Sequence, residues 1–115
     1  MPRPSTASLG AEAERRVRRH YRLRGWLVLD ANARAGGNEL DIVLRRGRRL
    51  VFAEVKFRAG GAFGDPLEAV GPGKERRVRR AAEAWLAARP DLAELEVCFE
   101  AVAVRGGRIE RTPLG

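Results

Sequence analysis

The sequence predicts an α/β protein in which a mixed central β-sheet is flanked by helices. Three observations lead to this class: an amphipathic helical pattern near the N-terminus, three strand-like segments in succession, and a second amphipathic helix followed by one or two more strands. A strand reached through a helix normally lies parallel to the strand before it, whereas strands joined by a short turn are antiparallel. We expect a single domain over residues 1–115, with residues 1–6 as a mobile tail.

The first half of the chain contains one expected helix and two expected strands. The helix covers residues 7–24, where an apolar side chain recurs at every fourth position and most arginines lie opposite, and Gly25 ends it. A short strand over 26–29 follows. A connection over 33–38, with two adjacent glycines, then leads to a second strand over 39–45.

A third strand over 50–57 follows a polar turn and completes the expected run of three. The next segment, 58–73, contains five of the 13 glycines and two of the six prolines, so we expect a loop.

The second expected helix covers residues 74–89 and ends before a proline. A fourth strand over 95–104 and a weak terminal strand through Arg111 complete the expected order.

Charge and composition limit the partners of this protein. The formal net charge is +8, and nearly every basic residue is an arginine, which pairs well with phosphate. We therefore expect a nucleic acid, DNA in particular, as the partner; the alternative is a compositional preference for arginine on a solvated surface. No segment is apolar enough to span a membrane and the start does not resemble a signal peptide, which predicts a cytoplasmic protein with no membrane partner.

The residue types also exclude two kinds of site. A single cysteine rules out an intramolecular disulfide and a cysteine-rich zinc site. Serine and threonine occur only near the termini, so catalysis by a serine nucleophile is not expected.

The third strand carries two charged side chains in an otherwise apolar run. Glu54 and Lys56 are two residues apart, so they share one face of the strand. Lys56 and Lys74 are the only lysines among 23 basic residues, which indicates that Lys56 is selected for a compact ammonium group.

A two-residue turn at Gly47 and Arg48 fixes how the second and third strands pair. It places Asp41 opposite Glu54 and Glu39 opposite Lys56, all four on one face. The other face is then wholly apolar, with Leu40, Ile42 and Leu44 against Val51, Ala53 and Val55. Facing carboxylates about 5 Å apart repel each other unless a cation lies between them. Their oxygen ligands suit Mg²⁺ or Mn²⁺.

Two helical residues are expected to face the same region. Glu14 lies at the edge of the buried stripe of the first helix, whereas Glu12 points away from it. Lys74 lies on the inner line of the second helix, at its N-terminal end.

These groups suit the hydrolysis of phosphodiester bonds. Asp41 and Glu54 would hold a divalent ion that lowers the pKa of a bound water, and Lys56 would orient that water or stabilise the developing charge. The alternative is a solvated hairpin in which Glu39 pairs with Lys56 and Asp41 with an arginine.

Several short blocks of this sequence resemble the uncharacterised bacterial YraN family. They are Glu14, Asn38-Glu39-Leu40-Asp41, the segment from Val51 to Arg58, Phe63-Gly64-Asp65-Pro66 and Lys74. Two positions depart from the family pattern: Asn38 stands where glycine is usual, and Cys98-Phe99-Glu100 replaces the common Arg-Phe-Asp.

The resemblance implies a restriction-endonuclease-like fold and a relation to archaeal Holliday-junction resolvases. It places Glu14, Asp41, Glu54 and Lys56 in a metal-dependent nuclease core and Glu39 in a family motif. We expect Glu14 as a further metal ligand, and Glu39 and Lys74 as supporting residues.

Two hypotheses of function follow. The first is a nuclease dependent on Mg²⁺ or Mn²⁺ that acts on structured or branched DNA, as a homodimer if it cuts two strands symmetrically. The second is a nucleic-acid-binding or adaptor module that keeps the fold without catalysis. In both cases we expect basic side chains near the site to bind the nucleic acid: Arg58, Arg76, Arg77 and Arg80.

Overall fold

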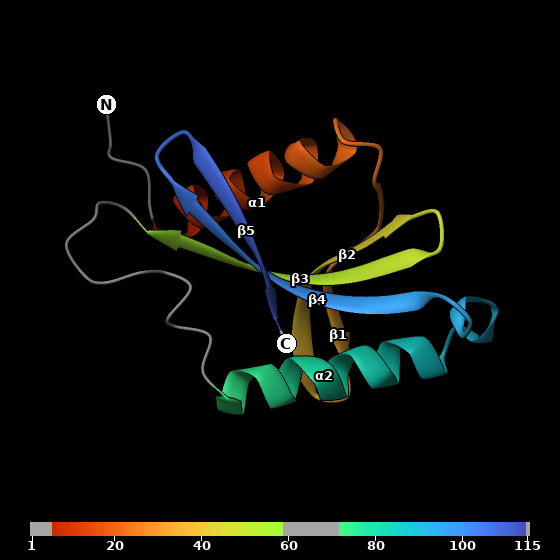
Figure 1. Ribbon diagram of the computed structural model, residues 1–115. Coiled ribbons are helices and arrows are strands. Elements are labelled where there is room, and N and C mark those ends of the chain that lie inside the picture. Colours follow the sequence, from red (N-terminus) through yellow and green to blue (C-terminus); the bar gives the residue numbers. More distant parts are fainter. Residues whose placement is uncertain (1–5, 59–71, 115) are drawn as a thin grey trace.

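Two helices cover opposite faces of one five-stranded sheet in the computed structural model of this protein (Figure 1). The structure describes residues 6–58 and 72–114, with side chains over 10–56 and 73–114. The elements in chain order are α1 (Thr6–Arg22), β1 (Leu27–Ala35), β2 (Asn38–Arg46), β3 (Arg49–Arg58), α2 (Pro72–Ala87), the short 3-10 helix η2 (Pro90–Leu92), β4 (Glu96–Arg105) and β5 (Arg108–Leu114).

The strands lie side by side in the order in which they occur in the chain. β3 and β4, which are joined through α2, pair in parallel, and the other neighbours are antiparallel. The predicted mixed sheet flanked by helices is therefore confirmed. Neither α1 nor α2 is both long and apolar enough to cross a membrane.

Some predictions fall on residues that the structure does not describe. Most of the predicted tail and most of the predicted 58–73 loop lie outside the described residues. Thr6 was assigned to the tail but belongs to α1.

A separate hydrophobic core lies on each face of the sheet. Alternation along β3 sends Val51 and Ala53 to the α1 side, and Leu50 and Phe52 to the α2 side. The inner lines predicted for the two helices are buried: Ala13, Val17 and Tyr21 of α1, and Val78, Ala81, Ala82 and Trp85 of α2.

The first strand is longer than predicted. We expected residues 26–29 as the strand and 33–38 as a connection, but β1 continues to Ala35 and only Gly36 and Gly37 form the turn. Both glycines have positive φ angles, 57° and 76°, as in a two-residue hairpin turn. The segment from Asp30 to Ala35 lacks β-branched residues, so pairing with β2, rather than propensity, makes it a strand.

The predicted alternation of β2 is wrong at Leu40, which belongs to the α2 core although Ile42 and Leu44 belong to the α1 core. The neighbouring edge strand β1 is irregular: its register with β2 shifts between Val28 and Asp30. Asn32 of β1 also has a left-handed backbone, with φ 51°. Asn32 lies across from Asp41, between the pairs Ala31 with Ile42 and Ala33 with Leu40. The side-chain alternation of β2 is therefore broken next to Asp41, where β1 is irregular.

Candidate active site

The two predicted carboxylates meet on the α2 side of the sheet. The register of β2 and β3 runs from Arg46 opposite Arg49 to Ile42 opposite Ala53, as predicted, and Asp41 and Glu54 are the next residues. Asp41 Oδ2 accepts a hydrogen bond of 2.8 Å from the backbone N–H of Val55. The carboxyl groups of Asp41 and Glu54 line one cavity, and the charge of Asp41 acts on Glu54. The two side chains therefore converge on one place.

Both lysines of the chain join this pair. Lys74 Nζ, at the start of α2, lies 3.6 Å from Glu54 Oε2, which confirms that Lys74 faces inward. Lys56 follows Glu54 on the same face of β3, and the positive charge of Lys74 acts on it. We call Asp41, Glu54, Lys56 and Lys74 the Glu54 cluster.

The ionisation of the Glu54 cluster is strongly perturbed. Glu54 is only 3 % exposed. Burial raises the pKa of Glu54 to about 8, and the charge and hydrogen bond of Asp41 add to the rise, while Lys74 and Lys56 oppose it. Burial also lowers the pKa of Lys56, and the charge of Lys74 lowers it further, while the charges of Glu54 and Asp41 raise it. Opposed shifts of this kind are typical of functional sites, although structural ion pairs also produce them.

A cavity of about 320 Å³ opens beside the pair, between the β1–β2 hairpin and α2. The hairpin lies against the helix at Gly36, where an added Cβ would be 3.2 Å from Ala84 Cβ and 3.3 Å from the carbonyl oxygen of Arg80. The residues that line the cavity are Asn38, Glu39, Asp41, Glu54, Lys74, Arg77 and Val78. An open cavity lined by a carboxyl pair and two cations has the chemistry to accept a phosphate group and a cation.

Glu39 and the arginines predicted to bind nucleic acid divide into two groups. Glu39 and Arg77 line the cavity. Arg76 and Arg80 are exposed on the same helix but are not among its lining residues, and the side chain of Arg58 lies outside the described residues. Arg77 is therefore the predicted arginine that the structure brings to the cavity.

Glu14 contacts β1 rather than the carboxyl pair. Its half-buried side chain accepts a 3.3 Å hydrogen bond from Asn32 Nδ2, and Asn32 lies across from Asp41. Over the residues with described side chains, no group of three or more His, Cys, Asp or Glu could hold a metal ion. Asp41 and Glu54 line the cavity and Glu14 is not among its lining residues, so metal binding by these three carboxylates stays a prediction.

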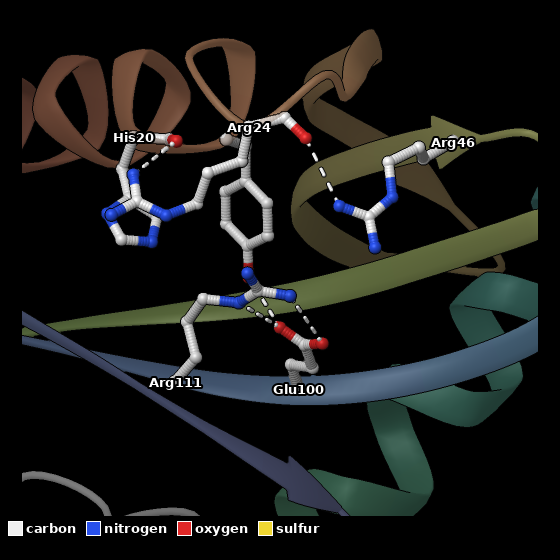
Figure 2. A network of polar contacts seen from close by, with 6 residues as sticks. His20, Arg24, Arg46, Glu100 and Arg111 are labelled. Carbon is white, nitrogen blue, oxygen red and sulfur yellow. Dashed lines mark hydrogen bonds and ion pairs between the residues drawn. The ribbon is translucent and has the colours of Figure 1, made fainter.

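The sequence reasoning missed a second carboxylate site, on the α1 side of the sheet. Glu100 of β4 accepts hydrogen bonds from the Tyr21 hydroxyl (2.7 Å) and from Nε and Nη2 of Arg111 (2.8 and 3.0 Å), as Figure 2 shows for Arg111. Burial alone would raise the pKa of Glu100, but these hydrogen bonds hold it below its usual value. We call Tyr21, Glu100 and Arg111 the Glu100 network. The signal available in the sequence was Tyr21, because a buried tyrosine hydroxyl normally has a hydrogen-bond partner.

Asn38 was also missed as a site residue. It lines the cavity, and its Nδ2 donates a 3.1 Å hydrogen bond to the carbonyl oxygen of Gly36. Asn38 therefore connects the turn of the β1–β2 hairpin to the lining of the cavity.

The fold and the site define a small α/β protein with a carboxyl pair and two lysines on the α2 face of its central sheet. This chain belongs to the uncharacterised protein family UPF0102, whose family model matches residues 13–104. That membership is consistent with the resemblance to the YraN family. It assigns no activity, so the activity has to be argued from the site.

Relatives from distant bacteria match nearly the full chain. A UPF0102 protein of Syntrophotalea carbinolica is 45% identical over 98 residues, which cover 85% of this chain and 79% of the relative. One from Frankia alni is 44% identical over 108 residues, or 94% of this chain and 85% of the relative. One from Yersinia pseudotuberculosis is 36% identical over 110 residues, or 95% of this chain and 94% of the relative.

Proposed function

We propose that this protein is a metal-dependent nuclease that hydrolyses phosphodiester bonds, with structured or branched DNA as its substrate. The observation that carries the proposal is the Asp41–Glu54 pair: two carboxyl groups line one cavity, Glu54 is buried, and Lys74 and Arg77 line the same cavity. Such an arrangement is unfavourable for stability, and binding of a cation would relieve it.

The carboxyl pair suits Mg²⁺ or Mn²⁺. These ions prefer oxygen ligands, and Mg²⁺ commonly uses one or two carboxylates and fills its other positions with water and substrate phosphate. Asp41 Oδ2 accepts a hydrogen bond from the N–H of Val55, which fixes the orientation of the carboxylate. In this proposal Glu14 completes the set of carboxylates, held by Asn32 on the strand next to Asp41.

The residues around the pair have separate roles in the proposed reaction. The bound ion would polarise a phosphoryl oxygen and lower the pKa of a coordinated water. Lys56, whose pKa burial lowers, would hold the attacking water or stabilise the developing negative charge. Lys74 and Arg77 would position the phosphate, because both line the cavity and carry positive charge. Arg76 and Arg80, exposed on the same helix, would contact the nucleic acid further from the reacting phosphate.

The second candidate is a nucleic-acid-binding or adaptor module without catalysis. Two observations favour it: the ion pair of Lys74 with Glu54, and the lack, over the residues with described side chains, of a third His, Cys, Asp or Glu with which the pair could hold a metal. Such a module would bind nucleic acid equally well after loss of the carboxylates. Its affinity would fall steeply with salt.

The experiment is a cleavage assay with purified protein on supercoiled, linear and four-way branched DNA, with Mg²⁺, Mn²⁺ or EDTA. We expect metal-dependent nicking, fastest on branched DNA, that falls at least about 100-fold in Asp41→Asn and Lys56→Ala. Glu14→Gln should also reduce it, whereas its matched control Glu12→Gln, exposed on the same helix, should not. Unchanged cleavage in Asp41→Asn would exclude this site. Salt-sensitive binding without cleavage under any metal would favour the second candidate.

A further inference from the structure

A second basic surface lies on the α1 side of the sheet, away from the Glu54 cluster. It forms where the end of α1, the β2–β3 hairpin and β5 meet, because Arg46 Nη1 of the hairpin donates a 3.1 Å hydrogen bond to the carbonyl oxygen of Arg24 (Figure 2). We call His20, Arg24, Arg46 and Arg111 the α1 surface.

Backbone carbonyl groups hold two of these arginines in place. Arg24 Nη1 donates to the carbonyl oxygen of His20 at 3.0 Å, and Arg46 bonds Arg24 in the same way. Both arginines are exposed, and in the described part of the chain neither guanidinium forms an ion pair with a carboxylate. A guanidinium has five N–H donors, so each keeps several for another partner.

Aromatic stacking orients the same side chains further. The guanidinium carbon of Arg46 lies 4.7 Å from the centre of the Trp26 ring, and that of Arg111 lies 5.8 Å from it. Stacked and hydrogen-bonded arginines lose less conformational entropy when they bind a ligand. The α1 surface is thus ordered before any partner arrives.

The α1 surface has an excess of positive charge. Its carboxylate neighbour Glu100 is already bound by both Nε and Nη2 of Arg111, and the charge of Arg46 also acts on it. Burial lowers the pKa of His20, and the charges of Arg24 and Arg111 lower it further, as expected in a positive environment. The single charge of Glu100 therefore does not balance the charges of Arg24, Arg46 and Arg111, which leaves positive charge for an anion.

We infer that the α1 surface binds the phosphate backbone of a second nucleic-acid segment, so that one molecule holds two segments on opposite faces of its sheet. Arg24 and Arg46 are the anchors, because guanidinium groups bind phosphate oxygens bidentately. Helices α1 and α2 lie on opposite faces of the sheet (Figure 1), so the sheet separates the α1 surface from the Glu54 cavity. We therefore expect that one straight duplex at the cavity does not reach the α1 surface. The inference rests on the proposed function for the identity of the polyanion, and it explains why a structured substrate would suit this chain.

The first test is a capture assay in EDTA, which excludes cleavage. One duplex is immobilised, the protein is added, and retention of a second, fluorescent duplex is measured. We expect the wild-type protein to retain the second duplex. The double variant Arg24→Ala, Arg46→Ala should reduce its retention about tenfold or more while the first duplex stays bound. The matched control Arg49→Ala, Arg108→Ala removes two other exposed charges and should retain the second duplex nearly as wild type does.

The second test needs no variant, because His20 is the sole histidine of the chain and gives an isolated signal in NMR. A duplex bound at the α1 surface should raise the pKa of His20, since phosphates oppose the arginine charges there. Retention of the second duplex by Arg24→Ala, Arg46→Ala as well as by wild type would overturn the inference, as would a His20 pKa that the duplex leaves unchanged. Binding of anionic phospholipid vesicles but of no second duplex would overturn it in favour of a membrane surface.

These outcomes are separable from those of the cleavage assay. Capture depends on Arg24 and Arg46 and proceeds without metal, whereas cleavage depends on Asp41 and Lys56. A protein that captures two duplexes but cuts neither would refute the nuclease and leave the second surface supported.

Discussion

Glu54 and Glu100 occupy adjacent positions on neighbouring strands, yet their environments differ in kind. β3 and β4 pair in parallel with Ala53 beside Glu100 and Glu54 beside Ala101, so the two glutamates point to opposite faces. Glu100 receives three hydrogen bonds from Tyr21 and Arg111, which hold its pKa low. Glu54 faces a second carboxyl group in a buried position, and its pKa is raised to about 8.

The contrast separates a group that stabilises the fold from one that does not. Every oxygen of Glu100 has a donor, so its charge is compensated where it stands. The Glu54 cluster keeps two carboxyl groups together and two lysines together, and each like pair opposes ionisation. Groups that are unfavourable for the empty protein are expected where a ligand restores the balance.

The largest expected difference is in activity. Glu54→Gln should reduce metal-dependent nicking at least about 100-fold, because it removes a proposed ligand, whereas Glu100→Gln should leave the rate near that of wild type. The measurement is the initial nicking rate at a temperature where both variants are folded. Equal losses in the two variants would contradict the division of roles.

The next difference is in stability, where the loss of Glu100, rather than of Glu54, should be harmful. Glu100→Gln should lower the free energy of unfolding by about 2–3 kcal/mol at pH 7, because it weakens a partly buried ion pair with Arg111. Urea unfolding followed by circular dichroism measures the change. The control is Glu110→Gln, an exposed position on β5, which should change stability by less than about 0.5 kcal/mol.

Glu54→Gln should stabilise the protein by about 2 kcal/mol at pH 6 and by more at pH 8. The pKa of Glu54 is about 8 in the folded protein against 4.5 ordinarily, so the folded state binds a proton that the unfolded state releases. The contribution of protonated Glu54 to the stability of the wild type is therefore fully present below pH 4.5 and is lost as the pH rises toward 8. The variant should match wild type near pH 4 and exceed it increasingly above. A variant less stable than wild type at pH 8 would mean that the ionised carboxylate of Glu54, like that of Glu100, stabilises the fold.

The smallest expected effect concerns the wall of the cavity. Gly36→Ala should cost about 1–2 kcal/mol, because Gly36 has a positive φ and its Cβ would press on Ala84 and Arg80. Gly37→Ala has the same backbone strain but open space, so it should cost about 1 kcal/mol. Nicking should fall only in the first variant, because only there does the hairpin move from α2. Parallel urea unfolding and nicking assays test this.

The sequence predicted the carboxyl pair well because local rules govern it. A two-residue turn fixes the register, and alternation along β3 fixes which residues share a face with Glu54. The inner position of Lys74 followed in the same way from helical spacing. These parts of the site depend on periodicity within single elements.

The parts that were missed depend on contacts between distant elements. Glu100, Tyr21 and Arg111 come from β4, α1 and β5, and no spacing in the sequence shows that they meet. The placement of Leu40 was wrong because the side-chain alternation of β2 is broken there, next to a left-handed residue on the neighbouring strand. The sequence pattern of β2 alone does not show this break. The length of β1 was wrong because its pairing with β2 outweighs a weak intrinsic preference.

The irregular backbone of β1 also bears on solubility. β1 is an edge strand of nine residues with two exposed leucines, Leu27 and Leu29, and a regular strand of this kind would recruit further strands from other molecules. The register shift near Leu29 and the left-handed Asn32 interrupt its outward row of amide groups at two points. The irregular backbone of β1, which lies next to Asp41, thus also protects the molecule from aggregating edge to edge.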